Sequence, residues 1–91
     1  MYRVSTTVRS AQNQDGTLVL DIERGRILRL NVTGSLIFQR LQHSQTEPQI
    51  IDGITREFHI SREIARRDVG EFLKSMEQVG LVHTDTAEVR P

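Results

Sequence analysis

The segment Thr17–Ser35 constrains the fold more than any other part of the sequence. Its first half, Thr17–Glu23, alternates large aliphatic residues with valine and acidic residues, and Arg26–Leu30 alternates again after a charged Glu-Arg-Gly-Arg break. Alternation with a period of two predicts two strands, and Gly25 supplies the positive φ that a tight hairpin needs. From Asn31, a good helix-capping residue, the apolar spacing becomes helical. The segment therefore predicts a β-hairpin that leads directly into a helix.

The residues before the hairpin predict a further strand. Tyr2–Arg9 holds β-prone residues among Ser and Thr and is expected to pair with the hairpin. Ala11–Gly16 is polar and ends in an Asp-Gly turn signal. Two or three short antiparallel strands are stable only when helices cover one face, so the rest of the chain must supply that cover.

Two helices are predicted directly after the hairpin. The first spans about Val32–Gln42 and the second about Glu47–Glu57. The second begins with a capping signature, because Thr46 can cap, Gln49 stands three residues later, and Pro48 is tolerated in a first turn. The apolar residues expected on the buried faces are Leu36, Ile37, Leu41, Ile50, Ile51, Ile54 and Phe58, with Phe38 at the margin.

A third helix, about Arg62–Val79, is predicted to be the longest. Ser61 can cap its start and Gly80 is placed to terminate it. Leu81 and Val82 are expected to return as a short extended segment. The helix has a broad apolar band, which can serve two surfaces. The band consists of Ile64, Ala65, Val69, Phe72, Leu73, Met76 and Val79.

The length of the chain predicts a single domain. Ninety-one residues offer too little interior for both a core and a buried catalytic cleft, which favours a binding module over an enzyme. We assign the domain to residues 1–83 and expect a polar, flexible tail at 84–91. The element order predicts an α+β, winged-helix-turn-helix-like fold, with a three-stranded antiparallel sheet followed by three helices.

The composition excludes several kinds of site. The chain has no cysteine, so thiolate metal sites and cysteine nucleophiles are excluded, and a reducing compartment is expected. His43, His59 and His83 are too widely spaced to suggest metal ligands. No glycine-rich phosphate loop or nucleophile elbow occurs, so no cofactor is expected. No segment approaches the roughly 20 apolar residues of a membrane helix, so we expect a cytoplasmic protein without a membrane partner.

Several different short motifs occur along the chain in a distinctive order. They are Val19-Leu20-Asp21, Leu30-Asn31-Val32-Thr33-Gly34, Asp68-Val69, Phe72-Leu73 and Gly80-Leu81-Val82. Their order and spacing resemble the PqqD family, whose members are peptide chaperones, or leader-peptide recognition elements, of ribosomally made and modified peptides. The resemblance spans about Asp15 to Val82 and implies the same three-strand, three-helix architecture.

The resemblance also implies a binding site. PqqD-like modules are expected to take the leader peptide as an added strand between one sheet edge and the third helix. On this chain that edge is Arg26–Leu30, with backbone groups of Arg26, Ile27, Leu28, Arg29 and Leu30 pairing with the peptide. From the residues alone, the two arginines are better explained as charges that keep an edge strand soluble than as part of a binding site. The candidate contacts on the third helix are Asp68, Glu71, Phe72, Ser75, Met76, Gln78 and Val79. Spacing leaves open which of them face the groove and which the core.

The family implies two settings for such a module. One delivers the precursor peptide to a radical SAM enzyme, and the other delivers it to a leader peptidase in lasso-peptide maturation. We favour a lasso-type or general modified-peptide pathway.

A winged-helix DNA-binding transcriptional regulator is the main alternative. The third helix carries four basic and four acidic residues, and this balance argues against nucleic acid as a partner. A structural subunit of a larger assembly is a third possibility.

Overall fold

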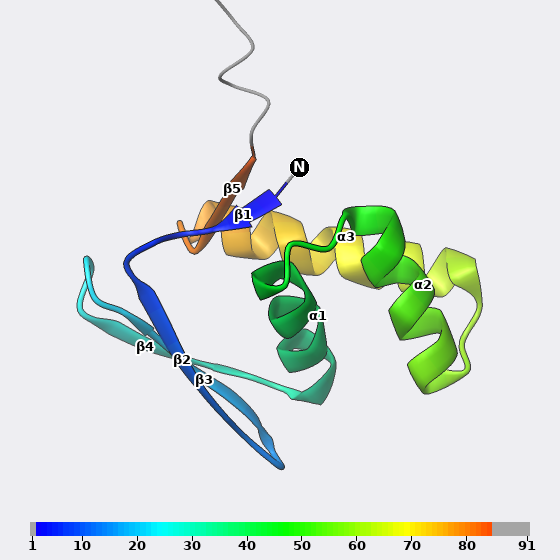
Figure 1. The fold of residues 1–91 in the computed structure, drawn as a ribbon, viewed down its shortest axis with the longest axis horizontal. Coiled ribbons are helices and arrows are strands. Elements are labelled where there is room, and N and C mark those ends of the chain that lie inside the picture. The colour runs from blue at the N-terminus through cyan, green and yellow to red at the C-terminus, as the bar shows by residue number, and fades with distance from the viewer. Residues whose placement is uncertain (1, 85–91) are drawn as a thin grey trace, which may run out of the picture.

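The computed structural model describes residues 2–84 of the chain (Figure 1). Its elements in order are β1 (Tyr2–Val4), β2 (Val8–Asn13), β3 (Gly16–Asp21), β4 (Arg26–Leu30), α1 (Val32–Gln42), α2 (Glu47–Phe58), α3 (Arg62–Gln78) and β5 (Val82–Thr84). Strands β2, β3 and β4 form an antiparallel sheet in that order, and β1 pairs with β5 in a separate ribbon. The expected α+β, winged-helix-turn-helix-like class, with a three-stranded antiparallel sheet and three helices, is confirmed.

The N-terminal segment forms two strands instead of the one predicted over Tyr2–Arg9. Tyr2–Val4 pairs with β5, whereas β2 begins at Val8 and pairs with β3. The polar segment Ala11–Gly16 was not predicted to contain a strand, but β2 continues to Asn13, and the turn lies next to the predicted Asp-Gly signal. The turn end of the β2–β3 hairpin projects away from the helices (Figure 1), and every β2 residue after Val8 is exposed. Polar residues on both faces therefore hide the strand from an apolar pattern.

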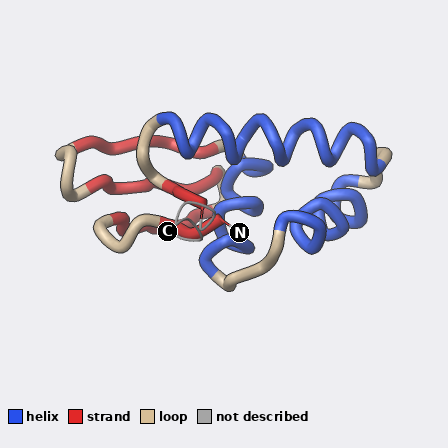
Figure 2. Tube along the Cα trace, turned by 90° about the horizontal axis from the view of Figure 1, so that it is seen from above, coloured by secondary structure: helices blue, strands red, loops and turns tan. Residues whose placement is uncertain are grey.

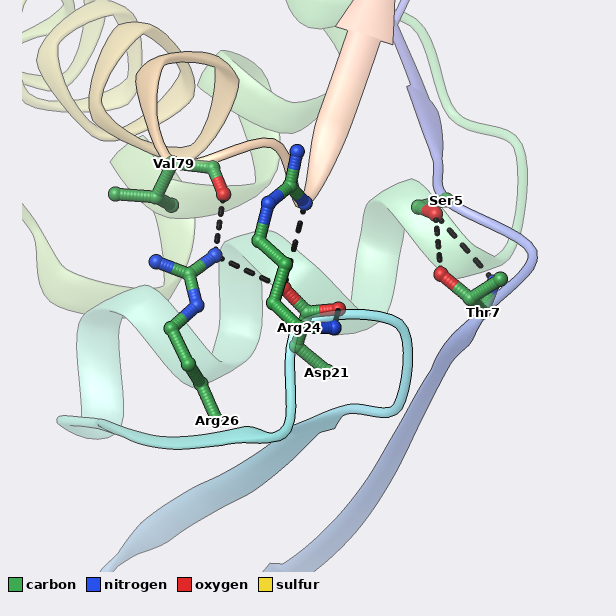
Figure 3. A network of polar contacts seen from close by, with 6 residues as sticks. All are labelled: Ser5, Thr7, Asp21, Arg24, Arg26 and Val79. Atoms are coloured by element: carbon green, nitrogen blue, oxygen red, sulfur yellow. Dashed lines mark hydrogen bonds and ion pairs between the residues drawn. The ribbon is translucent and has the colours of Figure 1, made fainter.

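Hydrogen bonds of Ser5 and Thr7 hold the link between β1 and β2. Ser5 Oγ lies 3.1 Å from Thr7 Oγ1 and accepts a hydrogen bond from the Thr7 backbone N–H at 3.4 Å (Figure 3). The Ser5 N–H in turn donates to the carbonyl of Leu81 at 2.9 Å. Such local side-chain bonds compete with a continuing strand, so the chain bends here.

The two turns of the sheet depend on glycine. Gly16 has φ of 140°, and a Cβ there would collide with the carbonyl oxygen of Leu30. Gly25 has φ of 63°, as predicted for the second turn. Strand β3 ends at Asp21, two residues before the predicted Glu23, because the Asp21 carboxylate accepts the backbone N–H of Arg24 at 3.3 Å and starts the turn.

The helices begin at the predicted caps. Asn31 caps α1, Thr46 and Gln49 form the predicted capping box of α2, and Ser61 caps α3. Helix α1 has its predicted bounds, α2 extends one residue further, and α3 ends one residue earlier. Gly80, with φ of 83°, follows α3 in the left-handed conformation expected of a terminator. These signals are local, which is why the sequence predicts them well.

The core lies between the inner face of the sheet and the helices. Phe38 is 1% exposed and is not marginal, whereas Leu36 is only partly buried. Helix α1 contacts β3, β4 and β1 as well as α2, so both sides of its apolar stripe are covered. Ile64, expected in the apolar band of α3, is 42% exposed. The largest fully buried side chains are Phe38, Ile37, Ile50, Ile54, Leu73 and Leu81.

Helix α3 runs along the molecule from its contact with α2 towards the strands (Figure 2). The predicted tail from residue 84 onward lies outside the described residues except for Thr84, which pairs with Tyr2 in the ribbon. None of the helices in residues 2–84 is long and apolar enough to cross a membrane.

Candidate functional site

Strand β4 is an edge strand of the three-stranded sheet. Its bounds are those predicted for the candidate edge, and it pairs through one side with β3, with Leu28 opposite Val19. Within residues 2–84 no strand pairs with its other side. An edge strand presents a row of backbone N–H and C=O groups that can bond another extended chain. All five predicted backbone positions, Arg26 to Leu30, belong to this edge strand.

The side chains of β4 alternate between the core and the outer face of the sheet. Leu30 is buried, and Leu28 is partly buried against the core. Arg26 points to the same side as these residues and is also partly buried. Ile27, 72% exposed, and Arg29 face outward. The strand is thus anchored through alternate residues, which leaves its free backbone edge accessible.

The structure shows which of the candidate residues on α3 are buried in the core and which are accessible. Ala65, Val69, Leu73 and Met76 are buried in the core, and Met76 is only 8% exposed. The candidates Asp68, Phe72 and Val79 are partly exposed, and Glu71, Ser75 and Gln78 are exposed. Phe72 and Val79 also pack against the core. The accessible candidates therefore lie beside the buried stripe of α3, with Met76 beneath them.

A hollow of about 370 Å³ opens between the start of α1 and α3. Phe72 lies against Gly34, where a Cβ would come within 2.8 Å of the ring atom Cε1. Because Asn31 directly follows the last residue of β4, the hollow begins where the free edge ends. It is lined by Asn31, Thr33, Gly34, Ile37, Asp68, Glu71, Phe72 and Ser75. Four candidates from α3 thus meet residues of α1 that were not predicted as site residues, although the Leu-Asn-x-Thr-Gly motif pointed to that segment.

The acidic side of the hollow is accessible to solvent. Asp68 forms an ion pair with Arg67 at 3.8 Å, and both side chains are largely exposed, at 43% and 67%. Exposed pairs of this kind contribute at most about 1 kcal/mol, so the pair holds the carboxylate only weakly. Asp68 and Glu71 can therefore interact with a polar or basic group in the hollow.

Arg26 of β4 bonds both the buried carboxylate of Asp21 and the end of α3 (Figure 3). Nη2 of Arg26 donates to Asp21 Oδ2 at 2.9 Å and to the carbonyl oxygen of Val79 at 2.5 Å. Asp21 is 1% exposed and also pairs with Arg24 at 3.4 Å. Asp21 was part of the motif pattern, but its ion pair with Arg26 and the bond from Arg26 to the end of α3 were not predicted. This clamp, formed by Asp21, Arg26 and the Val79 carbonyl, holds the strand edge and the helix together at the end opposite the hollow.

The clamp determines the charge state of its carboxylate. The hydrogen bond from Arg26 is the largest influence on Asp21 and lowers its pKa below the ordinary range, aided by the backbone and side chain of Arg24. Burial acts in the opposite direction but is outweighed. Asp21 is therefore an anion at neutral pH.

Arg24 explains a second requirement for glycine at the end of α3. Its guanidinium lies over Gly80, where a Cβ would come within 2.5 Å of Nη1. Gly80 therefore serves both as the positive-φ terminator of α3 and as a surface against which Arg24 packs.

The histidines lie on three separate elements. His43 caps the end of α1, His59 caps the end of α2, and His83 lies in β5. In the part of the chain that the structure describes, no group of three or more histidine or acidic residues is arranged to hold a metal ion.

Comparison with known proteins places these features in context. A family profile described as "Coenzyme PQQ synthesis protein D (PqqD)" matches residues 16–82. No curated protein matches the chain closely enough to count as a relative.

Two solved structures have the same fold over nearly the whole domain. One, described as "TbiB1 in Complex with the TbiA(beta) Leader Peptide", has a TM-score of 0.85 and 27% identity, covering 91% of this chain and 99% of that chain. The other, described as "Lasso peptide synthetase B1 complexed with the leader peptide", has a TM-score of 0.82 and 28% identity, covering 91% and 98% respectively.

Proposed function

The chain belongs to the PqqD family, and on that premise we propose that it binds the leader segment of a ribosomally made precursor peptide as an added strand along the free edge of β4. The observation that carries the proposal is a strand edge, unpaired within residues 2–84, that is bonded to the end of α3 and leads into the hollow between α1 and α3. The two similar structures, both described as complexes with a leader peptide, support the same role for this chain.

Strand addition separates affinity from selectivity. Backbone bonds to Arg26–Leu30 supply attraction that depends little on the leader sequence. Side chains of the leader that point towards α3 then meet Phe72 and Val79, or reach the hollow beside Asp68, Glu71 and Ser75. A leader is accepted when its alternate residues fit these contacts in one register.

The bound leader gives this chain its role without any chemistry of its own. Affinities from micromolar to nanomolar correspond to about 8–12 kcal/mol at standard state. Binding of that strength raises the local concentration of the precursor at a partner enzyme. The partner is an enzyme that processes the precursor, a leader peptidase or a radical SAM enzyme. We favour a leader peptidase in a lasso-type pathway, since both similar structures are described as leader-peptide complexes and one is described as lasso peptide synthetase B1.

Isotope-labelled protein titrated with a synthetic leader peptide tests the proposal. The peptide is the leader segment of a candidate precursor, and a random DNA duplex serves as the control ligand. We expect amide shifts concentrated in Arg26–Leu30 and Asp68–Val79 with the leader and none with the duplex. Silence with the leader, together with salt-sensitive shifts along Arg62–Lys74 on adding DNA, would instead identify a winged-helix regulator.

A further inference from the structure

Arg40 is a partly buried cation where α1 packs against α2 (Figure 1). Its guanidinium lies over Gly53 of α2, where a Cβ would come within 2.7, 2.8 and 3.0 Å of Cζ, Nη1 and Nε. Because these three distances are nearly equal, the flat face of the guanidinium rests on the backbone of α2. Nη1 donates to Oε1 of Gln45 at 3.3 Å, whereas the buried Nε has no hydrogen-bond partner within residues 2–84. No carboxylate of these residues pairs with Arg40, although a partly buried charge normally has a partner.

A pocket of about 220 Å³ opens beside this guanidinium. Gln49, Asp52 and Arg56 line it from α2, where their spacing of three and seven residues places them on one face of the helix. Arg40 and Gln45 line the rest. None of these residues belongs to the hollow between α1 and α3, so the pocket is separate from the proposed leader groove.

Most hydrogen-bond acceptors of this pocket are already engaged. Oε1 of Gln45 accepts from Arg40, and Oε1 of Gln49 accepts a backbone N–H of the α2 capping box at 2.8 Å. The carboxylate of Asp52 forms an ion pair with Arg62, which does not line the pocket. The groups left to meet a ligand are therefore mainly N–H donors, from the two glutamine amides and the guanidiniums.

The charge of the pocket is positive. Arg40 and Arg56 both line it, and neither forms an ion pair within residues 2–84. The one acidic side chain of the lining, Asp52, is neutralised from outside by Arg62. Guanidinium groups match the planar geometry of carboxylate and phosphate oxygens and bond them strongly.

We propose that the pocket between α1 and α2 is a binding site for an oxyanion, a phosphate or a carboxylate group, held by Arg40 and Arg56. Arg40 is oriented by Gly53 and Gln45 before any ligand arrives, which lowers the entropic cost of binding. Arg56 supplies the second positive charge from the exposed face of α2. The glutamine amides add neutral donors to the remaining oxygens of the anion.

Titration of the isotope-labelled full chain with sodium phosphate, and separately with sodium acetate, tests the proposal. Sodium chloride at the same ionic strength is the reference, because it screens charges without offering oxygen acceptors. We expect saturable shifts of the Gly53 amide, the Arg40 Nε–H and the side-chain amides of Gln45 and Gln49. The anion that saturates at the lower concentration identifies the ligand as phosphate or carboxylate.

Two variants remove the guanidinium from its place. Arg40→Gln should weaken anion binding at least about tenfold, with Arg66→Gln, an exposed arginine of α3, as the matched control. Gly53→Ala should act in the same direction, since its Cβ displaces the Arg40 guanidinium, which ends a flexible side chain and can move without unfolding the protein. Gly70→Ala, which meets no atom within 4 Å, is the control for that change.

Asp52→Asn should have the opposite effect. It removes the one acidic group of the pocket, so we expect the anion to bind more tightly than it binds the wild type. A gain in affinity distinguishes the charge of the pocket from general damage to the fold, which could only weaken binding.

Shifts that fail to saturate with either anion, or that chloride reproduces, would overturn the proposal. So would a folded Arg40→Gln protein that binds the anion as tightly as the wild type. Neither result bears on the proposed leader binding, because the leader titration monitors residues of β4 and α3 that do not line this pocket.

Discussion

The sheet has two edges, and within residues 2–84 only the β4 edge is bonded to the end of α3. Strand β2 forms one edge, and its residues beyond Val8 are exposed on both faces. Within residues 2–84, its one side-chain hydrogen bond to a helix is donated by Gln42 of α1 to Ser10 at 3.2 Å. Strand β4 forms the other edge; the clamp ties its first residue to the end of α3, and the hollow opens beyond its last residue. Both edges offer backbone groups, but under the proposed strand addition only β4 would add side-chain contacts from α3, so the helix would make this edge selective.

Proline substitutions at the two edges should give the largest difference in binding. Successive residues of a strand direct their N–H groups to opposite sides, so one of the two variants Ile27→Pro and Leu28→Pro removes a donor from the free edge of β4. We expect that variant to remain folded and to bind the leader at least about a hundredfold more weakly, by loss of several pairing bonds. Ala11→Pro and Gln12→Pro are the corresponding variants on β2.

Leader affinity from fluorescence anisotropy, with folding checked by circular dichroism, decides this comparison. The folded β2 variants should bind the leader like the wild type. Tight binding by folded variants at both β4 positions would contradict strand addition at this edge.

Removing the charge of Asp21 should loosen the β4 edge without affecting β2. Asp21→Asn leaves Arg26 with a weaker partner beside Val79, so we expect a lower thermal unfolding midpoint and a weaker affinity for the leader. Asp15→Asn, in the exposed turn at the far end of the sheet, is the matched control. An Asp21→Asn variant as stable as the wild type would show that the clamp contributes nothing to folding.

The same carboxylate predicts a pH dependence. The pKa of Asp21 is lowered in the folded protein, so its stabilising effect is present above the ordinary carboxyl pKa of about 4 and is lost as the pH falls through the lower folded value. Denaturant unfolding measured between neutral and strongly acidic pH should therefore converge for the wild type and Asp21→Asn at the acidic end. A difference between them that stayed constant across this range would contradict the charged clamp.

A pair of glycine substitutions should give the smallest and most specific effects. Gly34→Ala forces the Phe72 ring to shift, because the new Cβ would lie 2.8 Å from it, and such overpacking costs about 1–3 kcal/mol. Gly70→Ala on α3 meets no atom within 4 Å and should stabilise the helix by about 0.5–1 kcal/mol. We expect weaker leader binding in the first variant alone, measured beside urea unfolding. Unchanged leader binding by a folded Gly34→Ala protein would exclude Phe72 from the contact.

The parts of this fold that the sequence predicted are those determined by neighbouring residues. The caps at Asn31, Thr46 and Ser61 and the glycine terminator at Gly80 involve residues within a few positions, so their patterns are readable. The bounds of β4 followed from a clear alternation of apolar residues. The candidate edge was therefore predicted correctly as a structural element.

The parts that were missed depend on contacts between distant residues. The ribbon of β1 and β5 joins the two ends of the domain, and Arg26 reaches the Val79 carbonyl across 53 positions. No local pattern reports such a contact. The full burial of Phe38, which was expected at the margin, likewise follows from how helices pack on two sides, and so does the burial of Met76, which spacing had left open. Periodicity identifies an apolar face but does not say which partner covers each part of it.

A scan of backbone N-methylated leader peptides tests strand addition most directly, because it leaves the protein unchanged. Each peptide carries one methylated amide, and its affinity is measured by calorimetry. Our account predicts losses at every second leader position across the segment opposite Arg26–Leu30, since only alternate N–H groups face β4. Uniform tolerance of methylation, or losses without the period of two, would show that the leader binds this chain in some other conformation.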